Sequence, residues 1–178
     1  MFRLLLGVVA FGALTTAAAG QSPEKQLAAL PNVSFPAPHR VAAGALQAGD
    51  IALLQVARVQ EVINLRADSE TPGFDEAAAV RDAGIRYHNL PIHGANDLTR
   101  SNVRHFDQLL SNAGERLTLV HCASSNRVGA MIALRAALVG GQSTEAALVE
   151  GRRWGLKGLE PEVRERLDAW SASADSRP

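Results

Sequence analysis

The sequence predicts an α/β fold with three layers, in which helices cover both faces of a mostly parallel central sheet of about 4–5 strands. Two observations predict this fold class. Short apolar runs rich in β-branched residues alternate with longer amphipathic runs, an alternation typical of βαβ units. At 178 residues the chain also has the length expected for one domain, and it contains no internal repeat.

The individual elements follow from periodicity and from residues that begin or end helices. The predicted strands cover residues 40–43, 61–65, 87–92 and 117–121. The predicted helices cover residues 50–59, 74–83, 99–111, 128–139, 143–154 and 161–170. Gly84 and Gly114 stand at expected helix C-termini, where glycine is favoured because it adopts the left-handed conformation without strain. The hydroxyl of Thr99 can accept from unpaired N–H groups at a helix start. Pro161 suits the first turn of the last helix.

The N-terminal residues have the pattern of a secretory signal peptide, which we assign to residues 1–19. Arg3 precedes an apolar run over 4–14, and residues 15–19 are the small residues that a signal peptidase requires. The apolar run is short for a bilayer span, and an uncleaved anchor is the alternative. We therefore expect an exported protein, periplasmic or secreted, without stable membrane association after cleavage of the signal.

The rest of the chain divides into three parts. Residues 20–38 contain four prolines and predict an extended lead-in, because proline removes a backbone donor and interrupts helices. The folded domain is expected over residues 39–170. Residues 171–178 are polar and are expected to form a frayed tail.

Composition excludes several classes of function. The chain balances 18 Lys+Arg against 18 Asp+Glu, so its net charge gives no basic surface for nucleic acid or for an acidic membrane. Its one cysteine, Cys122, excludes an internal disulfide and a cysteine-rich zinc site. The five histidines show no ligand spacing joined to a carboxylate cluster, and we expect neither a metal nor another cofactor.

The candidate chemistry lies between Cys122 and Arg127. Cys122 follows a buried strand and Arg127 lies at the start of an apolar helix, so the residues between them form a turn where α/β sheets bind ligands. Backbone N–H groups of the turn and of the helix start favour an anion, a thiol beside them is stabilised as thiolate, and Arg127 adds donors for an oxyanion. The site would then bind phosphate and present it to sulfur. A small buried core cysteine with a surface arginine is the alternative. The candidate binding residues are Ala123, Ser124, Ser125, Asn126 and Arg127.

These residues resemble the signature of the cysteine-based protein tyrosine and dual-specificity phosphatases. More closely, the chain resembles the bacterial phosphatase-like family found beside or fused to β-lactamase-like hydrolases. The matching features run in order through residues 41–44, 62–66 with Glu70, 84–87, 90–92 and 121–127. The resemblance implies a dual-specificity-phosphatase-like fold and a phosphoric monoester hydrolase that forms a phosphocysteine. It implies a phosphorylated protein or a small phosphate ester as substrate, and no cofactor.

The resemblance also implies roles for particular residues. Cys122 would attack phosphorus, and Arg127 and the loop N–H groups would stabilise the equatorial oxygens. The acid of the family is an aspartate in the loop after the strand preceding the signature strand, where Asp97 is the only aspartate. A solvated turn residue is the alternative for Asp97, and His93 in the same loop could supply the proton or line the rim.

Three further residues are candidates for supporting roles. Strand alternation should direct the side chain of His121 away from that of Cys122, where it could hold the loop by hydrogen bonds or simply be a satisfied histidine at a strand end. Arg66 and Glu70 follow another strand on the same rim of the sheet. They could extend the cationic surface toward the substrate or form a structural ion pair that holds the loop.

Two features keep other functions open. Only four residues separate Cys122 from Arg127, one fewer than in tyrosine phosphatases, and loops of similar length hold the persulfide cysteine of rhodanese-like sulfurtransferases. Val128 stands where phosphatases usually have a Ser or Thr that stabilises the leaving thiolate, although Ser124 or Ser125 could replace it. A non-catalytic module that binds phosphate or another anion would explain Val128 directly. Neither the physiological substrate nor the oligomeric state can be read from the sequence.

Overall fold

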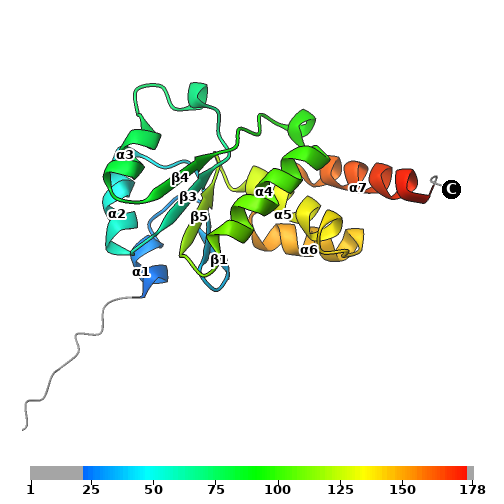
Figure 1. Cartoon of the computed structure of the whole chain (residues 1–178), viewed down its shortest axis with the longest axis horizontal. Coiled ribbons are helices and arrows are strands. Elements are labelled where there is room, and N and C mark those ends of the chain that lie inside the picture. Colours follow the sequence, from blue (N-terminus) through cyan, green and yellow to red (C-terminus); the bar gives the residue numbers. More distant parts are fainter. Residues whose placement is uncertain (1–21, 176–178) are drawn as a thin grey trace, which may run out of the picture.

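The computed structural model describes residues 22–175, and the signal peptide assigned to residues 1–19 lies outside them. The described chain forms a five-stranded mixed sheet with strand order β1-β2-β5-β3-β4 and with helices on both faces (Figure 1). This arrangement confirms the predicted three-layer α/β fold. The strands are β1 (Ser34–Ala37), β2 (Arg40–Ala43), β3 (Glu61–Asn64), β4 (Arg86–Asn89) and β5 (Thr118–His121).

Four of the strands are parallel, and β5 lies among them. In register, Ala43 of β2 and Asn64 of β3 both pair with His121 at the last position of β5. The first strand is the exception, because β1 pairs antiparallel with β2 at one edge of the sheet. The segment that follows His121 therefore leaves the sheet at the carboxyl ends of neighbouring parallel strands, where ligands bind in open α/β sheets.

The helices form two groups, one on each side of the sheet (Figure 1). The first group contains α1 (Pro23–Leu27), α2 (Ile51–Val56) and α3 (Glu76–Asp82). The second group contains α4 (Arg100–Ala113), α5 (Asn126–Leu138), α6 (Thr144–Arg153) and α7 (Glu160–Asp175). Short 3-10 turns lie at Ala48–Asp50, Asp68–Glu70 and Ala95–Asp97. Within residues 22–175, no helix combines the length and apolar character needed to cross a bilayer.

Alternation along β5 divides the core between the two sides of the sheet. Leu119 packs into the apolar cluster beneath α1 and α2, whereas Val120 and Cys122 pack into the cluster beneath α4 to α7. This division is the expected consequence of strand geometry, in which successive side chains point to opposite faces. His121 and Cys122 accordingly direct their side chains to opposite sides of the sheet.

Glycines allow α5 and α6 to pack closely behind the signature loop. A Cβ added at Gly129 would lie 2.6 Å from the carbonyl oxygen of Gly151, and one added at Gly151 would lie 2.8 Å from the carbonyl oxygen of Gly129. Both distances are shorter than a carbon and an oxygen can approach, so only glycine fits at either position. This contact holds the start of α5, and with it Arg127, against the C-terminal helices.

The structure differs from the prediction at both ends of the folded domain. Residues 20–38 are not a simple lead-in to a domain beginning at residue 39, since they contain α1 and β1, and Leu27 and Leu30 are buried in the core. Proline is compatible with both elements, because Pro23 lies at the first turn of α1 and Pro36 lies in an edge strand. At the other end, α7 continues to Asp175 instead of ending at residue 170, and residues 171–175 contain no Gly or Pro that would end the helix.

Candidate active site

Cys122 directly follows the parallel strand β5 and is 1% exposed. Its backbone N–H donates to the carbonyl oxygen of Ala43 at 3.4 Å, which continues the pairing of β5 with β2 for one more residue. The thiol is free. The sulfur is thus fixed at the carboxyl edge of the sheet, on the side covered by α4 to α7.

The turn after Cys122 is tied to the N-terminal residues of the domain. Ser124 forms an isolated bridge with Gly44, and the N–H of Ala45 donates to the carbonyl oxygen of Ala123 at 3.2 Å. Ser125 has φ 64° and donates its hydroxyl to the carbonyl oxygen of Asn32 at 2.9 Å. Ser125 is therefore occupied, whereas the side chains of Ala123 and Ser124 are exposed.

The start of α5 leaves backbone donors unused. Within residues 22–175, the N–H groups of Ala123, Ser124, Asn126 and Arg127 have no hydrogen-bond partner. The side chain of Asn126 is itself committed elsewhere, since its Oδ1 accepts from the N–H groups of Lys157 at 2.8 Å and Leu159 at 3.3 Å. The backbone N–H of Asn126 can contribute to an anion site, where the unpaired N–H groups and the helix dipole both favour negative charge.

Glu70 holds the guanidinium of Arg127 through a bidentate ion pair. The two nitrogens of Arg127 lie 2.7 and 2.6 Å from the carboxylate oxygens of Glu70, and Nη1 also donates to the carbonyl oxygen of Ile92 at 2.7 Å. Hydrogen bonding by Arg127 lowers the pKa of Glu70 from its ordinary 4.5 to about 2. The pKa of Arg127 is raised, chiefly by its hydrogen bonds to Glu70 and further by the neighbouring Cys122 side chain.

Arg66 joins the same ion-pair group through Oε2 of Glu70, the oxygen that also accepts from Arg127. Its Nη2 donates to the carbonyl oxygen of Glu70, and its Nε lies 3.8 Å from the Glu70 carboxylate. Arg66 is buried and so does not extend the cationic surface outward. Of the two roles considered for Arg66 and Glu70, the geometry fits the structural ion pair, with Arg127 as a second partner that sequence reasoning did not assign.

His121 forms a buried pair with Glu76 on the opposite side of the sheet from Cys122. The Nε2 of His121 lies 2.7 Å from Oε1 of Glu76, and both residues are buried. His121 is thus bound to α3 through Glu76, a partner that sequence reasoning missed, and its role in supporting the Cys122 loop stays a prediction. Glu76 lies in the first turn of α3, where acidic residues are common, so its position in the sequence carried no signal.

Asp97 is paired with His93 in the loop between β4 and α4. One oxygen of its carboxylate accepts from the backbone N–H of His93 at 2.7 Å and lies 2.8 Å from His93 Nδ1. These two contacts lower the pKa of Asp97 below its ordinary value. Asp97 is thus stabilised as a carboxylate, while the imidazole of His93 is 69% exposed. Both residues considered for proton transfer lie together in one loop.

The described residues contain no group of three or more His, Cys, Asp or Glu side chains that could hold a metal ion. The chemistry available at the loop is instead that of a nucleophile and an oxyanion. A buried sulfur, a fixed guanidinium and unpaired backbone N–H groups meet at the carboxyl end of β5. Such an arrangement can hold a tetrahedral oxyanion against a thiolate.

No model of a known protein family matches the chain, and no curated protein matches it. Solved structures do match it. A candidate phosphatase of the DUF442 group from Shewanella putrefaciens CN-32 has a TM-score of 0.65 and 23% identity, and the match covers 83% of this chain and 97% of that one. TpbA from P. aeruginosa has a TM-score of 0.60 and 25% identity, with 78% of this chain and 84% of that one covered.

The match extends to a more distant phosphatase. Kinase associated phosphatase, KAP, has a TM-score of 0.62 at 15% identity, with 78% of this chain and 89% of that one covered. These similarities establish that the chain has the fold of the cysteine-based phosphatases. Among the matched structures, one TpbA variant with a cysteine replaced by serine was solved in complex with phosphotyrosine, at 22% identity to this chain.

Proposed function

We propose that the protein is a cysteine-dependent phosphoric monoester hydrolase that acts through a phosphocysteine intermediate. One observation supports this proposal above the others. Glu70 fixes the guanidinium of Arg127 next to Cys122, at a loop where the N–H groups of residues 123, 124, 126 and 127 are unpaired within the described chain. A core cysteine with an unrelated surface arginine would not require the bidentate contact that holds Arg127.

In the first step, the thiolate of Cys122 attacks phosphorus while the bond from phosphorus to the ester oxygen breaks. Arg127 and the N–H groups of residues 123–127 donate to the equatorial oxygens, where negative charge is held during the transfer. Because Glu70 already fixes Arg127, the guanidinium does not have to reorganise during the step. The leaving oxygen takes a proton from an acid at the rim.

We propose the pair formed by His93 and Asp97 as the source of that proton. The two hydrogen bonds from His93 stabilise the ionised form of Asp97, and an acid must instead carry its proton when the step begins. His93 can be the donor when its exposed imidazole is protonated, with Asp97 orienting the ring through Nδ1. Asp97 is then a positioning residue, in contrast to the acid role that the family resemblance implies.

In the second step, water attacks phosphorus and the thiolate of Cys122 leaves, which regenerates the enzyme and releases phosphate. Val128 is fully buried and has no hydroxyl to stabilise that thiolate. Ser125 is committed to the carbonyl oxygen of Asn32. Ser124, which is exposed and lies two residues after the cysteine, is the hydroxyl that remains for this role.

The proposed substrate is a phosphorylated protein or a small phosphate ester. Support comes from Arg127, whose guanidinium is held by Glu70 and can donate to one phosphate group. The TpbA complex with phosphotyrosine provides a precedent in the same fold. The four-residue loop supports placement with the bacterial phosphatase-like family named above, and the N-terminal pattern supports export to the periplasm or the medium.

The test is hydrolysis of p-nitrophenyl phosphate by the purified protein under reducing conditions. Turnover that disappears in Cys122→Ser and falls strongly in Arg127→Lys supports the proposal. Thiosulfate-to-cyanide sulfur transfer measured on the same samples tests the sulfurtransferase alternative, which the short loop favours. Vanadate binding without turnover of either kind would overturn the hydrolase proposal and identify an anion-binding module.

A further inference from the structure

Ser125 lies in the middle of the signature loop, between two pairs of unpaired backbone donors. The N–H groups of Ala123 and Ser124 come before it in the chain, and within residues 22–175 they have no hydrogen-bond partner. The N–H groups of Asn126 and Arg127 come after it and are unpaired in the same way. Because the chain turns at Ser125, its φ sets the direction of the second pair relative to the first. This one residue therefore decides whether the four donors can serve one oxyanion.

The backbone of Ser125 has a conformation that glycine usually supplies. Its φ is 64°, in the left-handed region, which is strained for a residue with a Cβ. Gly155 passes close to it, since a Cβ added at Gly155 would lie 2.5 Å from the Cβ of Ser125. A strained residue persists only where the surrounding structure holds it in place. We therefore looked for the contact that holds Ser125 in this turn.

The hydroxyl of Ser125 makes that contact. Serine at the start of a helix commonly accepts, through its side-chain oxygen, from a free N–H group of the first helical turn. Ser125 directly precedes α5 but makes no such capping hydrogen bond. Its hydroxyl instead donates to the carbonyl oxygen of Asn32 at 2.9 Å. The hydrogen bond holds the left-handed turn, and it also leaves the N–H groups at the start of α5 free for a ligand.

The segment that contains Asn32 is well anchored. Leu30, two residues earlier, is 3% exposed and belongs to the apolar core. The carbonyl oxygen of Pro31 accepts at 2.6 Å from the N–H of Gly44, which directly follows β2. Gly44 in turn forms the isolated bridge with Ser124. The residues before β1 are therefore part of the structure that shapes the signature loop.

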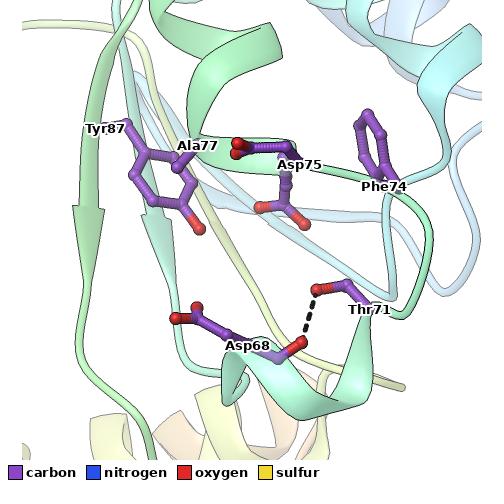
Figure 2. A pocket seen from close by; sticks show the side chains of 7 residues that line it. Asp68, Thr71, Phe74, Asp75, Ala77 and Tyr87 are labelled. Atoms are coloured by element: carbon purple, nitrogen blue, oxygen red, sulfur yellow. Dashed lines mark hydrogen bonds between the residues drawn. The ribbon is translucent and has the colours of Figure 1, made fainter.

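A separate segment holds the side chain of Arg127. Its partner Glu70 ends a short 3-10 turn, next to which the hydroxyl of Thr71 donates to the carbonyl oxygen of Asp68 at 3.1 Å (Figure 2). The guanidinium is thus held from the connection between β3 and α3, whereas the backbone of the loop is held from the segment before β1. Loss of the Ser125 contact should disturb the N–H groups while Glu70 still holds the guanidinium.

We propose that Ser125 is a positioning residue, whose hydrogen bond to Asn32 sets the affinity of the signature loop for a tetrahedral oxyanion. This role rests on the anion-binding part of the function proposed above and does not require turnover. The side chain of Ser125 is 1% exposed and donates to Asn32, so it does not touch the oxyanion itself. Its effect reaches the ligand through the backbone on either side of it.

The measurement is the dissociation constant of tungstate, a tetrahedral oxyanion, by isothermal titration calorimetry of the purified protein. Ser125→Ala removes the hydroxyl and keeps a Cβ, so the left-handed turn is strained and no longer held. We expect this variant to bind tungstate about tenfold more weakly. Ser125→Gly also lacks the hydroxyl, but glycine adopts the left-handed conformation without strain. We expect its affinity to fall only about threefold.

The matched control is Ser143→Ala. Ser143 caps α6 beyond the C-terminal end of α5, where its oxygen accepts from the N–H of Ala146 at 3.4 Å. This variant also loses a contact between a hydroxyl and the backbone, and it should bind tungstate as the unchanged protein does. Circular dichroism establishes that each variant is folded at the temperature of the titration. A serine that serves stability alone would lower the melting temperature and leave the dissociation constant unchanged.

Equal affinity in Ser125→Ala and Ser143→Ala would overturn the proposal, as would weaker binding by Ser125→Gly than by Ser125→Ala. An unchanged protein that binds no tungstate would overturn it as well. Hydrolysis of p-nitrophenyl phosphate, measured on the same samples, separates this role from the proposed function. The expected order of affinities without any hydrolysis would support the role of Ser125 and overturn the hydrolase. Hydrolysis with equal tungstate affinity in all variants would overturn the role of Ser125 alone.

Discussion

Glu70→Gln tests the ion pair that holds the proposed catalytic arginine, at nearly constant side-chain volume. The carboxylate accepts from both terminal nitrogens of Arg127 at 2.7 and 2.6 Å, and the neutral amide can accept from only one of them. A hydrogen bond to a charged group contributes about 1.5–3 kcal/mol, and the 31% exposure of Glu70 places this pair near the lower end through solvent screening. We expect the variant to lose about 2 kcal/mol of unfolding free energy at pH 7.

The pH dependence of this loss gives a sharper test than its size. The folded protein holds the pKa of Glu70 at about 2 through Arg127, below the ordinary 4.5. Between these values the unfolded chain binds more protons than the folded chain, so the stability from this carboxylate is complete above pH 4.5 and is lost as the pH falls toward 2. The difference in unfolding free energy between the unchanged protein and Glu70→Gln should therefore narrow as the pH falls from 4.5 toward 2.

The assay is urea unfolding followed by circular dichroism at pH 7, 5 and 3, for the unchanged protein, Glu70→Gln and the control Glu165→Gln. Glu165 is an exposed residue of α7, and its variant should track the unchanged protein. Because Arg127 is freed in Glu70→Gln, kcat/KM for p-nitrophenyl phosphate should also fall by about 10- to 100-fold. Equal unfolding free energies of the unchanged protein and Glu70→Gln at pH 7 would refute the predicted role of this ion pair. A difference that stays constant down to pH 3 would also refute it.

Two further predictions concern helix packing and proton transfer. Gly129→Ala should lower the unfolding free energy by about 3 kcal/mol or more, because the new methyl group overlaps Gly151. Gly49→Ala is the control, since no atom lies within 4 Å of a Cβ added at Gly49. A similar decrease in melting temperature in the two variants would contradict the packing argument. His93→Ala should slow the hydrolysis of phenyl phosphate more than that of p-nitrophenyl phosphate, whose leaving group needs no proton. Asp97→Asn should act in the same direction but less strongly, and an Asp97→Asn defect larger than that of His93→Ala would return the acid role to Asp97.

The sheet and the larger helices were predictable because their signals are local. The spacing of apolar residues indicates β3, β5, α4 and α5 without any knowledge of what these segments pack against. The oxygen of Thr99 accepts from the N–H of Asn102 at 3.2 Å, the expected cap, and Gly84 and Gly114 have positive φ. By contrast, β1 contains Pro36 and is held by pairing with β2, which no pattern within residues 34–37 announces.

The sequence indicated which residues belong to the candidate site, but it did not indicate which other residues bind them. Cys122 and Arg127 are close in sequence, so their spacing alone indicates a loop that can face an anion. The partner of Arg127 is Glu70, 57 residues away, and the partner of His121 is Glu76, 45 residues away. Such pairs depend on which loops the topology brings together, and the residues next to each partner in the sequence give no sign of this. The same holds for Asn32, whose carbonyl oxygen anchors the signature loop.

The central claim is that Cys122 carries the phosphoryl group between the two steps. The most direct measurement is intact-protein mass spectrometry after rapid denaturation of the protein during turnover of p-nitrophenyl phosphate, with the modified peptide identified by fragmentation. We expect an added phosphoryl group on Cys122 in the unchanged protein and none in Cys122→Ser. Hydrolysis by Cys122→Ser at the rate of the unchanged protein, or a turning-over enzyme with no phosphoryl group on Cys122, would contradict it.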